Sequence, residues 1–294
     1  MRNKDRRGDT GKPRPPHPAK GRGKPEKKPF SVPRMPSRAA PKPAAPPPPR
    51  RDRGQKPAAG AQWLYGIHAV QAALANPRRR LGRACLTPRA QETLGNLTNR
   101  VQVETFDPAA IDRLLPPGAV HQGAAIEAWP LKSRDLDEIL SEAKDVRRIV
   151  LVLDQLSDPH NVGAILRTAA AFNVTAVVVQ DRHAPPQSGA LAKAASGALD
   201  LIPYVEVVNI ARALDDLAKR GFWRIALAGD GDMPLSEVAL QGDVALVLGS
   251  EGDGIRRLVR EHCESVAFIP IESAVESLNV SNAAAIALYE MRRS

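Results

Sequence analysis

The chain has 294 residues, enough for about two domains, and its formal net charge of +10 is unevenly distributed. Residues 1–60 hold 18 of the 42 basic side chains and four of the 32 acidic ones, so the remaining residues carry a net charge of −4. No apolar run approaches the roughly 20 residues that cross a bilayer, and Cys85 and Cys263 lack the spacing of a metal site. The composition favours a protein of the reducing cytoplasm, with neither a membrane segment nor a metal.

The first 60 residues form a basic, proline-rich segment that we call the arm. It contains 15 of the 27 prolines, and its single aromatic residue is Phe30. Its apolar surface is too small to offset the entropy of ordering, so the arm is predicted to be disordered. The positive charge suits an arm that finds nucleic acid by releasing counterions, and it equally suits a solubilising tail. The prolines argue against a mitochondrial transit helix, and the apolar core of a secretion signal is missing.

The next region, residues 61–130, has the pattern of a small α/β module, which we call the N-terminal module. Apolar side chains at helical spacing after a short entry turn predict a helix over residues 63–75. A brief helix is predicted to end at Pro116. Short alternating runs predict strands at 83–87, 101–105 and 121–129.

Residues 131–147 are polar and are predicted to be a linker containing a weak helix. The C-terminal region, residues 148–294, then alternates short Val, Ile, Leu and Ala runs with helical stretches. The apolar runs, predicted to be strands, are 148–155, 175–180, 224–229, 243–249 and 265–271. This alternation predicts an α/β fold with a mostly parallel sheet, flanking helices and ligands at the carboxyl ends of the strands.

Three segments of the C-terminal region carry polar residues where buried strands end. The first, residues 158–169, follows the strand that ends at Asp154, and Asn161 is predicted to be the N-cap of the next helix. Arg167 lies six residues further on, among Ala, Ile, Leu and Thr. Its side chain either covers apolar helix surface or reaches a phosphate or a developing oxyanion. The spacing alone leaves both interpretations open.

The second segment, residues 248–254, places three glycines around Glu251 at the end of a strand. Glycines permit positive φ and close approach of the backbone to a ligand. The order G-x-x-G-x-G on a late strand differs from the dinucleotide-binding fingerprint. Because Glu251 lies at the end of a strand, a role in a site is favoured over a simple turn.

The third segment, residues 269–285, is rich in small polar side chains before an alanine-rich helix. Ser277, Asn279, Ser281 and Asn282 supply more hydroxyl and amide groups than one N-cap needs. The alanines that follow allow close packing. This pattern suits either a capped helix at a tight interface or a chain threaded through a narrow opening.

Together the three segments closely resemble the motifs of the SpoU (TrmH) family of RNA ribose 2′-O-methyltransferases, in the SPOUT class. The three motifs occur in the family order, and the matching residues are Asn161, Gly163 and Arg167, then Gly249, Glu251, Gly252 and Gly254, then Ile269, Pro270, Ser277, Leu278, Asn279, Val280 and Ser281. The N-terminal module resembles the L30e-like RNA-binding domain of the subgroup that methylates a guanosine in 23S rRNA. The arm lies outside the resemblance.

The resemblance implies a SPOUT-type fold whose C-terminal region is tied in a trefoil knot. It also implies S-adenosyl-L-methionine as the cofactor, with Gly249, Ile269 and Leu278 lining its site. Members form homodimers, and the alanine-rich last helix suits that interface. The implied substrate is RNA, with 23S rRNA or a large-subunit precursor favoured, and neither DNA nor a membrane is expected. The alternatives are a sister enzyme acting on tRNA or other rRNA, and a non-catalytic RNA-binding or ribosome-assembly protein.

The same resemblance assigns catalysis to Arg167, with Asn161, Glu251, Ser277 and Asn279 holding the arginine and the ribose in place. The family proposal makes this arginine the general base. A guanidinium normally stays protonated in proteins. A protonated Arg167 that anchors a phosphate and stabilises a developing alkoxide is therefore physically easier to achieve than an arginine that acts as the base. Both roles predict that Arg167 is essential for methyl transfer.

Overall fold

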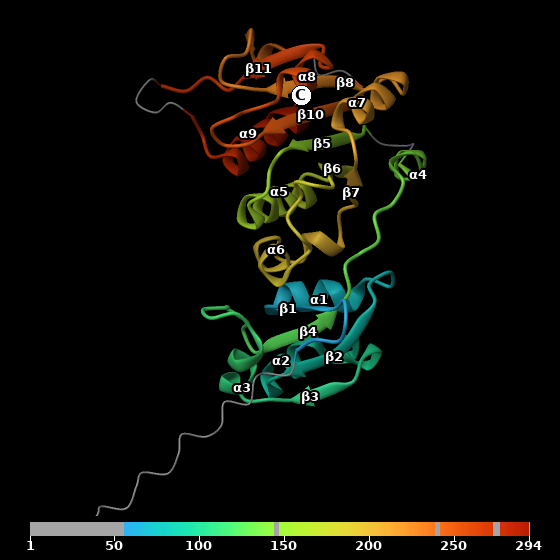
Figure 1. Ribbon diagram of the computed structural model, residues 1–294, viewed down its shortest axis with the longest axis vertical. Helices are drawn as coiled ribbons and strands as arrows, with labels where there is room; N and C mark the ends of the chain where they lie inside the picture. The colour runs from blue at the N-terminus through green and yellow to red at the C-terminus, as the bar shows by residue number, and fades with distance from the viewer. Residues whose placement is uncertain (1–55, 144–146, 239–241, 273–276, 294) are drawn as a thin grey trace, which may run out of the picture. The chain divides into compact units, whose positions relative to one another are not determined.

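The computed structural model describes residues 56–143, 147–238, 242–272 and 277–293, which contain two β-sheets (Figure 1). The disorder predicted for the arm mostly concerns residues outside this set. Its last five residues are described, and they form a turn in which the Ala61 N–H donates to the carbonyl of Ala58. The indole N–H of Trp129 donates to the carbonyl of Ala59 at 3.2 Å. The described end of the arm therefore contacts the N-terminal module.

The N-terminal module is built on the smaller sheet, whose strand order is β1-β4-β2-β3. Only β2 and β3 pair in parallel; β4 is antiparallel to both of its neighbours. The strands are β1 (Gln62–Tyr65), β2 (Leu81–Leu86), β3 (Val103–Thr105) and β4 (Ala124–Ala128). The helices are α1 (Ile67–Ala75), α2 (Pro88–Leu94), the 3-10 helix η1 (Gly95–Arg100) and α3 (Pro108–Leu114). Thr87 and Asp107 cap α2 and α3, each before a proline at the first helical position.

The sequence prediction of a helix over residues 63–75 was wrong for its first residues, which form β1. Leu64 packs in the main core under α1, whereas Trp63 and Tyr65 pack in a second cluster on the opposite face of the sheet. Because both faces are buried, the strand reads as a continuous apolar run without a period of two. Gly66, with φ of 94°, separates β1 from α1.

The C-terminal region is built on the larger sheet, with strand order β7-β6-β5-β10-β8-β11-β9. All of its pairings are parallel, which confirms the predicted fold class. The strands are β5 (Ile149–Asp154), β6 (Ala176–Gln180), β7 (Tyr204–Val207), β8 (Trp223–Leu227), β9 (Met233–Pro234), β10 (Val244–Gly249) and β11 (Ser265–Phe268). The strands β7 and β9 were not predicted. Both lie at sheet edges, where short pairing and exposed side chains such as Glu206 weaken the apolar signal.

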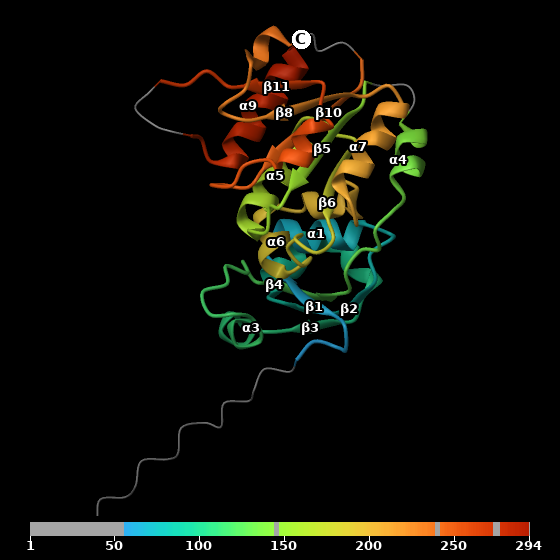
Figure 2. The same cartoon turned by 45° about the horizontal axis from the view of Figure 1, so that its top comes forward.

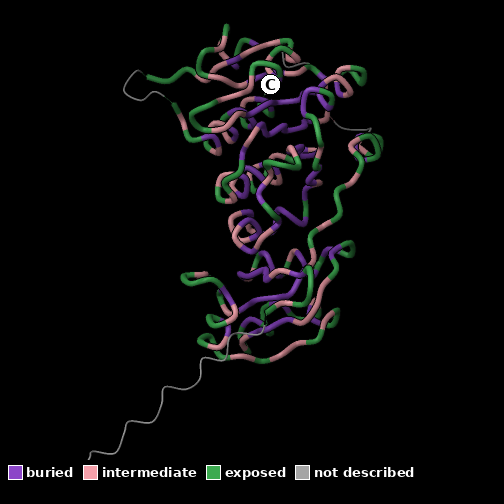
Figure 3. Tube along the Cα trace, in the orientation of Figure 1, coloured by how far each residue is buried: buried purple, intermediate pink, exposed green. Residues whose placement is uncertain are grey.

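Helices cover both faces of the larger sheet, so alternate residues of its strands enter different cores. Leu151 and Leu153 of β5 belong to the cluster with α5 and α9, whereas Val150 and Val152 belong to the cluster with α4, α7 and α8. Figures 1 and 2 show α5 and α9 on one side of β5 and β10, and α7 on the other. In Figure 3 the strands between these layers are buried along most of their length. These helices are α4 (Leu136–Glu142), α5 (Pro159–Ala171), α7 (Ile210–Lys219), α8 (Arg257–Glu261) and α9 (Val280–Arg293). The region also contains the helix α6 (Gly189–Ala194) and the 3-10 helices η2 (Ala198–Asp200) and η3 (Leu235–Glu237).

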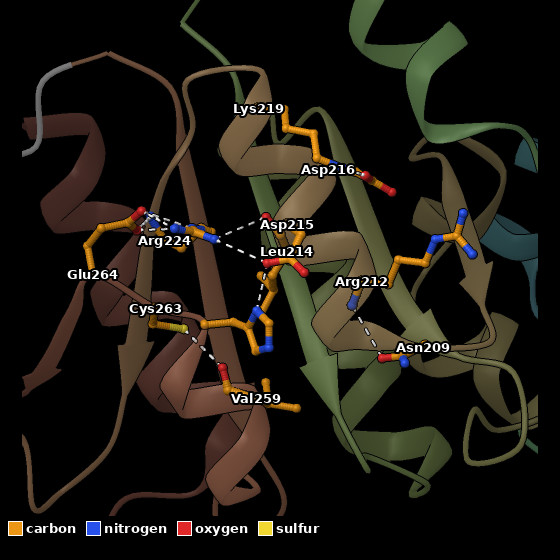
Figure 4. Close-up of polar contacts among 11 residues, drawn as sticks. Asn209, Arg212, Leu214, Asp215, Asp216, Lys219, Arg224, Val259, Cys263 and Glu264 are labelled. Carbon is orange, nitrogen blue, oxygen red and sulfur yellow. Dashed lines mark hydrogen bonds and ion pairs between the residues drawn. The ribbon is translucent and has the colours of Figure 1, made fainter.

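Polar contacts join α7, β8 and the segment after α8 (Figure 4). Arg224 of β8 is paired with Glu264, and its guanidinium also donates to the carbonyl of Leu214. The Cys263 thiol donates to the carbonyl of Val259 at 3.5 Å, and burial raises the pKa of Cys263 to about 12. The contacts of Arg224 connect α7 and the segment after α8 to the sheet. Because its pKa is raised, Cys263 has little thiolate character at neutral pH.

The weak helix predicted between the two regions is α4, and it is part of the core. Ile139 is 3% exposed and Leu140 is fully buried. Upstream of α4, the hydroxyl of Ser133 accepts from the backbone N–H of Glu206 at the edge strand β7 (3.0 Å). The described part of this connection is therefore bound to the larger sheet along its course.

Candidate functional site

The three polar segments start at the carboxyl ends of β5, β10 and β11, as predicted. In the sheet, β5 and β10 are neighbours with Asp154 opposite Gly249, and β8 joins β10 to β11. Parallel strands present their carboxyl ends at one edge of a sheet, so the loops that follow them gather there. Residues separated by more than 100 positions in the sequence thus converge.

One carboxylate oxygen of the second segment contacts residues of the first and third segments. The Oε1 atom of Glu251 accepts from Nδ2 of Asn161 at 3.2 Å, from Nδ2 of Asn279 at 2.6 Å and from the backbone N–H of Val280 at 3.4 Å. Nδ2 of Asn279 also donates to Oδ1 of Asn161 at 3.0 Å. We call Asn161, Glu251 and Asn279 the Glu251 network. Glu251 and Asn279 are exposed, so a substrate can reach the network.

The prediction that Asn161 caps α5 was wrong, because the N-cap is Asp158. The Asp158 carboxylate accepts from the backbone N–H groups of His160 and Asn161 at 3.1 and 3.3 Å. Pro159 then occupies the first helical position, where its fixed φ and missing N–H cost nothing. Since Asp158 supplies the cap, the side chain of Asn161 is available to the Glu251 network.

Asn279 has two roles in the third segment. Its Oδ1 atom accepts from the backbone N–H and from the hydroxyl of Ser281, at 2.9 and 2.6 Å, and so holds the first turn of α9. Its Nδ2 atom binds the Glu251 network. Two of the surplus polar groups noted in the sequence are explained by these contacts.

A cavity of about 920 Å³ lies beside the Glu251 network, and Glu251 is part of its lining. The residues predicted to bind a cofactor, Gly249, Ile269 and Leu278, all line this cavity, and so does Ser277. Its other walls come from the ends of β8, β10 and β11 and from the first turn of α9. The size falls in the range of about 300–1,000 Å³ that small-molecule sites occupy.

The loop that borders the cavity depends on glycine at position 249. A Cβ atom added there would lie less than 3.0 Å from the backbone of Gly254 and Ile255, a separation that real Cβ atoms essentially never show. The loop closes on itself through Ser250 and Gly254, which exchange backbone hydrogen bonds at 3.1 and 3.0 Å. The close approach predicted from the glycine pattern is thus made to the chain itself, and it shapes the cavity wall.

Arg167 lies on α5 but does not join the other predicted residues. It is exposed, and among the described residues it has no hydrogen-bond or ion-pair partner. Six residues from Asn161, it lies about 9 Å along the helix axis and about 120° around it. A guanidinium without a protein partner remains available for an anionic ligand.

Comparison with known proteins bears on both parts of the chain. Residues 148–289 match the model of the SpoU rRNA Methylase family, and residues 63–134 match that of RNA 2′-O ribose methyltransferase substrate binding. A 23S rRNA (guanosine-2′-O-)-methyltransferase RlmB from Xanthomonas campestris is 40% identical over 79% of this chain and 96% of its own length. This chain belongs to the SpoU rRNA methylase family. A relative of the same name from Pseudomonas aeruginosa is 39% identical, over 79% of this chain and 97% of its own.

Solved structures share the SpoU fold. The SpoU methyltransferase AviRb from Streptomyces viridochromogenes, in complex with AdoMet, has a TM-score of 0.66 and 22% identity over 80% of this chain and 90% of its own. A protein from Porphyromonas gingivalis assigned to the TrmH family has a TM-score of 0.66 and 27% identity, over 80% of this chain and 91% of its own. The larger sheet and its flanking helices are thus those of SpoU proteins.

Sequence reasoning missed an ion pair that holds the cavity loop of this SpoU protein. The fully buried carboxylate of Asp154 accepts from the Arg256 backbone N–H and Nε, both at 2.9 Å, and from Nη2 at 2.6 Å. Nη2 of Arg256 also donates to Gln180 at 3.0 Å. An aspartate at the end of an otherwise apolar strand was the available signal, since a buried carboxylate needs a charged partner. The partner itself lies 102 positions away.

Two polar features of the cavity could serve a ligand. The hydroxyl oxygen of Ser250 is buried, and it has no hydrogen-bond partner among the described residues. A buried hydroxyl without a partner is unfavourable, so a ligand that bonds to it gains affinity. Asp230 also lines the cavity, and a hydrogen bond from Arg260 lowers the pKa of its carboxyl group.

Within the described residues, no group of three His, Cys, Asp or Glu side chains is arranged to hold a metal ion. No helix in that part of the chain is both long enough and apolar enough to cross a membrane.

Replacing Glu251 with alanine should lower kcat/KM for RNA methylation by about tenfold, because two amides and one backbone N–H lose a charged acceptor. Glu251→Gln keeps an acceptor oxygen in place and should lose less than about threefold. Steady-state kinetics of both variants, with circular dichroism as a check on folding, measures the difference. Equal losses in the two variants would show that the charge, and not the shared acceptor, is what matters.

Proposed function

We propose that this protein transfers the methyl group of S-adenosyl-L-methionine to the ribose 2′-hydroxyl of a guanosine in 23S rRNA. The observation that carries the proposal is the Glu251 network beside the cavity, where all three segments of the family pattern meet. Relatives named for this activity match along nearly their whole length, so both the catalytic and the substrate-binding parts are shared with them.

The cavity suits the proposed methyl donor. Apolar side chains such as Ile269 and Leu278 offer a surface for a nucleoside base, while Ser250 provides an unused hydrogen-bonding group. Backbone groups of the glycine loop lie along the wall at Gly249, Gly252 and Gly254, which carry no side chain. Asp230 offers a carboxylate to a positively charged group of the donor.

In the proposed reaction the 2′-oxygen forms a bond to the methyl carbon while the carbon–sulfur bond breaks and leaves its electron pair on the sulfur, and the hydroxyl proton passes to solvent water. When bound, the donor supplies a methyl group that the positive sulfur has already activated. What remains for the protein is to align the groups and to favour loss of the hydroxyl proton.

We assign the alkoxide-stabilising role to Arg167. Side chains on a helix point back toward its N-terminus, so an extended arginine on α5 reaches toward the helix end where Asn161 lies. Its charge would anchor a phosphate of the RNA and lower the energy of the developing alkoxide. Asn161, Glu251, Ser277 and Asn279 would position the ribose and keep the three segments together.

The alternatives are less well supported. A tRNA-modifying enzyme is disfavoured because the relatives that match along nearly their whole length are named for 23S rRNA. A non-catalytic RNA-binding protein would have no need for an intact Glu251 network or for an arginine without a protein partner.

Three further features follow from the family likeness and are proposed with it. The trefoil knot is supported by the match of residues 148–289 to the SpoU family model. The homodimer is supported by Ile286 and Tyr289, which are 43% and 59% exposed on α9 and can form an apolar contact surface. A cytoplasmic location follows from an rRNA substrate.

Mapping of ribose methylation by mass spectrometry in a deletion strain tests the proposed function. Loss of one guanosine methylation in 23S rRNA, restored by the wild-type gene and not by the Arg167→Ala variant, is the expected result. Loss of a tRNA methylation instead would support the sister enzyme. Unchanged rRNA and tRNA would point to the non-catalytic alternative.

Removing residues 1–55 should weaken RNA binding and flatten its dependence on salt, because this segment holds 17 of the arm's 18 basic side chains. Truncation at this position leaves the turn that contacts Trp129 in place. The measurement is the slope of log K against log salt for full-length and truncated protein, together with a map of the methylated nucleotide, which should not change. A full-length variant with the arm's Lys and Arg changed to Gln separates charge from length. An unchanged slope would make the arm a passive tail.

A further inference from the structure

The N-terminal module and the C-terminal region meet in a close-packed contact, formed by α1 and β1 on one side and by α6 and η2 on the other. A Cβ atom added to Gly189 would lie less than 3.0 Å from the carbonyl of Trp63 and from the ring of Tyr65. A Cβ atom on Gly197 would lie 2.9 Å from the carbonyl of His68. Glycines at these two positions allow the backbones of the two regions to approach directly.

A buried ion pair spans this contact. The Arg79 guanidinium, in the turn after α1, donates to the Asp200 carboxylate in η2 through Nε at 2.8 Å and Nη2 at 3.0 Å. Both side chains are almost fully buried, at 1% and 2% exposure. Such bidentate geometry fixes orientation as well as distance.

Two amide side chains complete the arrangement. Nδ2 of Asn76 donates to the Asp200 carboxylate at 3.0 Å. Gln187 accepts from the backbone N–H of Leu131 at 2.8 Å and donates to its carbonyl at 3.0 Å, and it also accepts from Arg79 at 3.3 Å. We call Asn76, Arg79, Gln187 and Asp200 the interdomain network. It holds the module, the start of the connecting segment and η2 together.

We propose that the interdomain network is a positioning device, which holds the N-terminal module in one orientation so that RNA bound there presents its target ribose to the active site. This inference rests on the proposed function. A buried ion pair adds little stability over an apolar contact, and removing one partner is strongly unfavourable. The network therefore contributes geometry: any movement of the module would leave Arg79 and Asp200 buried without a partner or would expose the glycine contacts.

A fixed module affects kcat more than RNA affinity. If the module moved freely, RNA would still bind to it, but the bound ribose would be aligned with the active site for a smaller fraction of the time. Misplacement by about 1 Å can cost 10²-fold in rate. The network is expected to act through alignment, since none of its members lines the cavity or belongs to the Glu251 network.

The test compares two Asp-to-Asn variants in the full-length chain. Asp200→Asn removes the charge and turns an amide N–H toward the buried guanidinium. Asp243→Asn makes the same chemical change in the Arg148 pair, which lies within the C-terminal region. Gln187→Ala, which removes no charge, serves as the variant of choice if Asp200→Asn does not fold.

The first readout is a distance distribution from pulsed electron spin resonance. Spin labels on exposed positions of α2 and α7, Thr93→Cys and Lys219→Cys, are placed in a chain whose two native cysteines are replaced. Dilution with unlabelled protein removes distances between copies of the chain. A single narrow distribution is expected for the parent and for Asp243→Asn, and a broadened one for Asp200→Asn or Gln187→Ala.

The second readout is the kinetics of RNA methylation. For Asp200→Asn, kcat should fall by about tenfold or more, while the Kd values for RNA and for S-adenosyl-L-methionine stay within about threefold. A merely destabilised protein would lose active sites and would bind less of both ligands. A narrow distribution with unchanged kcat in Asp200→Asn would overturn the proposal. Broadening in a protein that methylates no RNA even as wild type would support the network and reject the proposed function.

Discussion

Replacing Arg167 with alanine is expected to lower kcat for methyl transfer by about 10²- to 10³-fold, the usual effect of removing one group that stabilises a developing oxyanion. The fold should survive, because Arg167 is exposed and has no partner among the described residues. Affinity for S-adenosyl-L-methionine should also survive, since Arg167 does not line the cavity. Single-turnover rates and calorimetric cofactor binding measure the two quantities separately.

Arg220→Ala is the matched control for this variant. Arg220 is an exposed arginine at the end of α7, and its ion pair with Asp137 lies at the surface, where such pairs contribute little. Its loss should leave kcat within about twofold. Near-normal turnover by Arg167→Ala would refute the role assigned to this arginine.

A lysine at the same position separates the two roles considered for Arg167. An anchor for phosphate and alkoxide needs positive charge, so Arg167→Lys should keep much of the activity at neutral pH and lose it as the lysine deprotonates, near an ordinary pKa of about 10.4. A general base needs the neutral form, so its rate should rise with pH over that range. The pH–rate profile of this one variant therefore decides between them.

Replacing Gly249 with alanine is expected to weaken binding of S-adenosyl-L-methionine by about 10²-fold. The added methyl group meets the backbone of Gly254 and Ile255, which has no flexible end to move aside. Overpacking of this kind costs about 1–3 kcal/mol, and here the strain falls on the loop that borders the cavity. Calorimetric titration and thermal melting should show both the lost affinity and a lower Tm.

Gly229→Ala is the matched control for the melting experiment. Gly229 lines the same cavity, but a Cβ atom added there meets nothing within 4 Å and its φ lies outside the left-handed region. Its Tm should equal that of the wild type. If Gly249→Ala also melted at the wild-type temperature and bound the donor normally, the loop would have to be far more pliable than the structure indicates.

The sequence predicted the parallel sheet and the meeting of its three polar segments because both depend on local patterns. Apolar runs of the β5 type mark strands buried on both faces, and carboxyl ends of parallel strands meet wherever they occur. Individual side-chain contacts were harder to predict from the sequence. Asp158 and Asn161 are both good N-caps, and only the position of Pro159 and the distant Glu251 decide between them.

Ion-pair partners that are distant in the sequence could not be predicted from local sequence patterns. Asp154 is bound by Arg256, and Arg79 by Asp200, across 102 and 121 positions of the chain. Nothing in the neighbourhood of either acid identifies its partner, because the pairing depends on which loops the completed fold brings together. The strand β1 was missed for a related reason: its two faces are buried by residues that follow it at a distance.

The bond between Asp154 and Arg256 has a consequence for how ligand affinity responds to stability. Because the backbone N–H of Arg256 is held by a fully buried strand-end carboxylate, the cavity loop cannot open without disturbing the centre of the sheet. Local opening and global unfolding are thereby joined in one cooperative unit. A ligand held by this loop should protect the whole larger sheet against unfolding by heat or denaturant. A destabilising core substitution far from the cavity should likewise lower the affinity for that ligand.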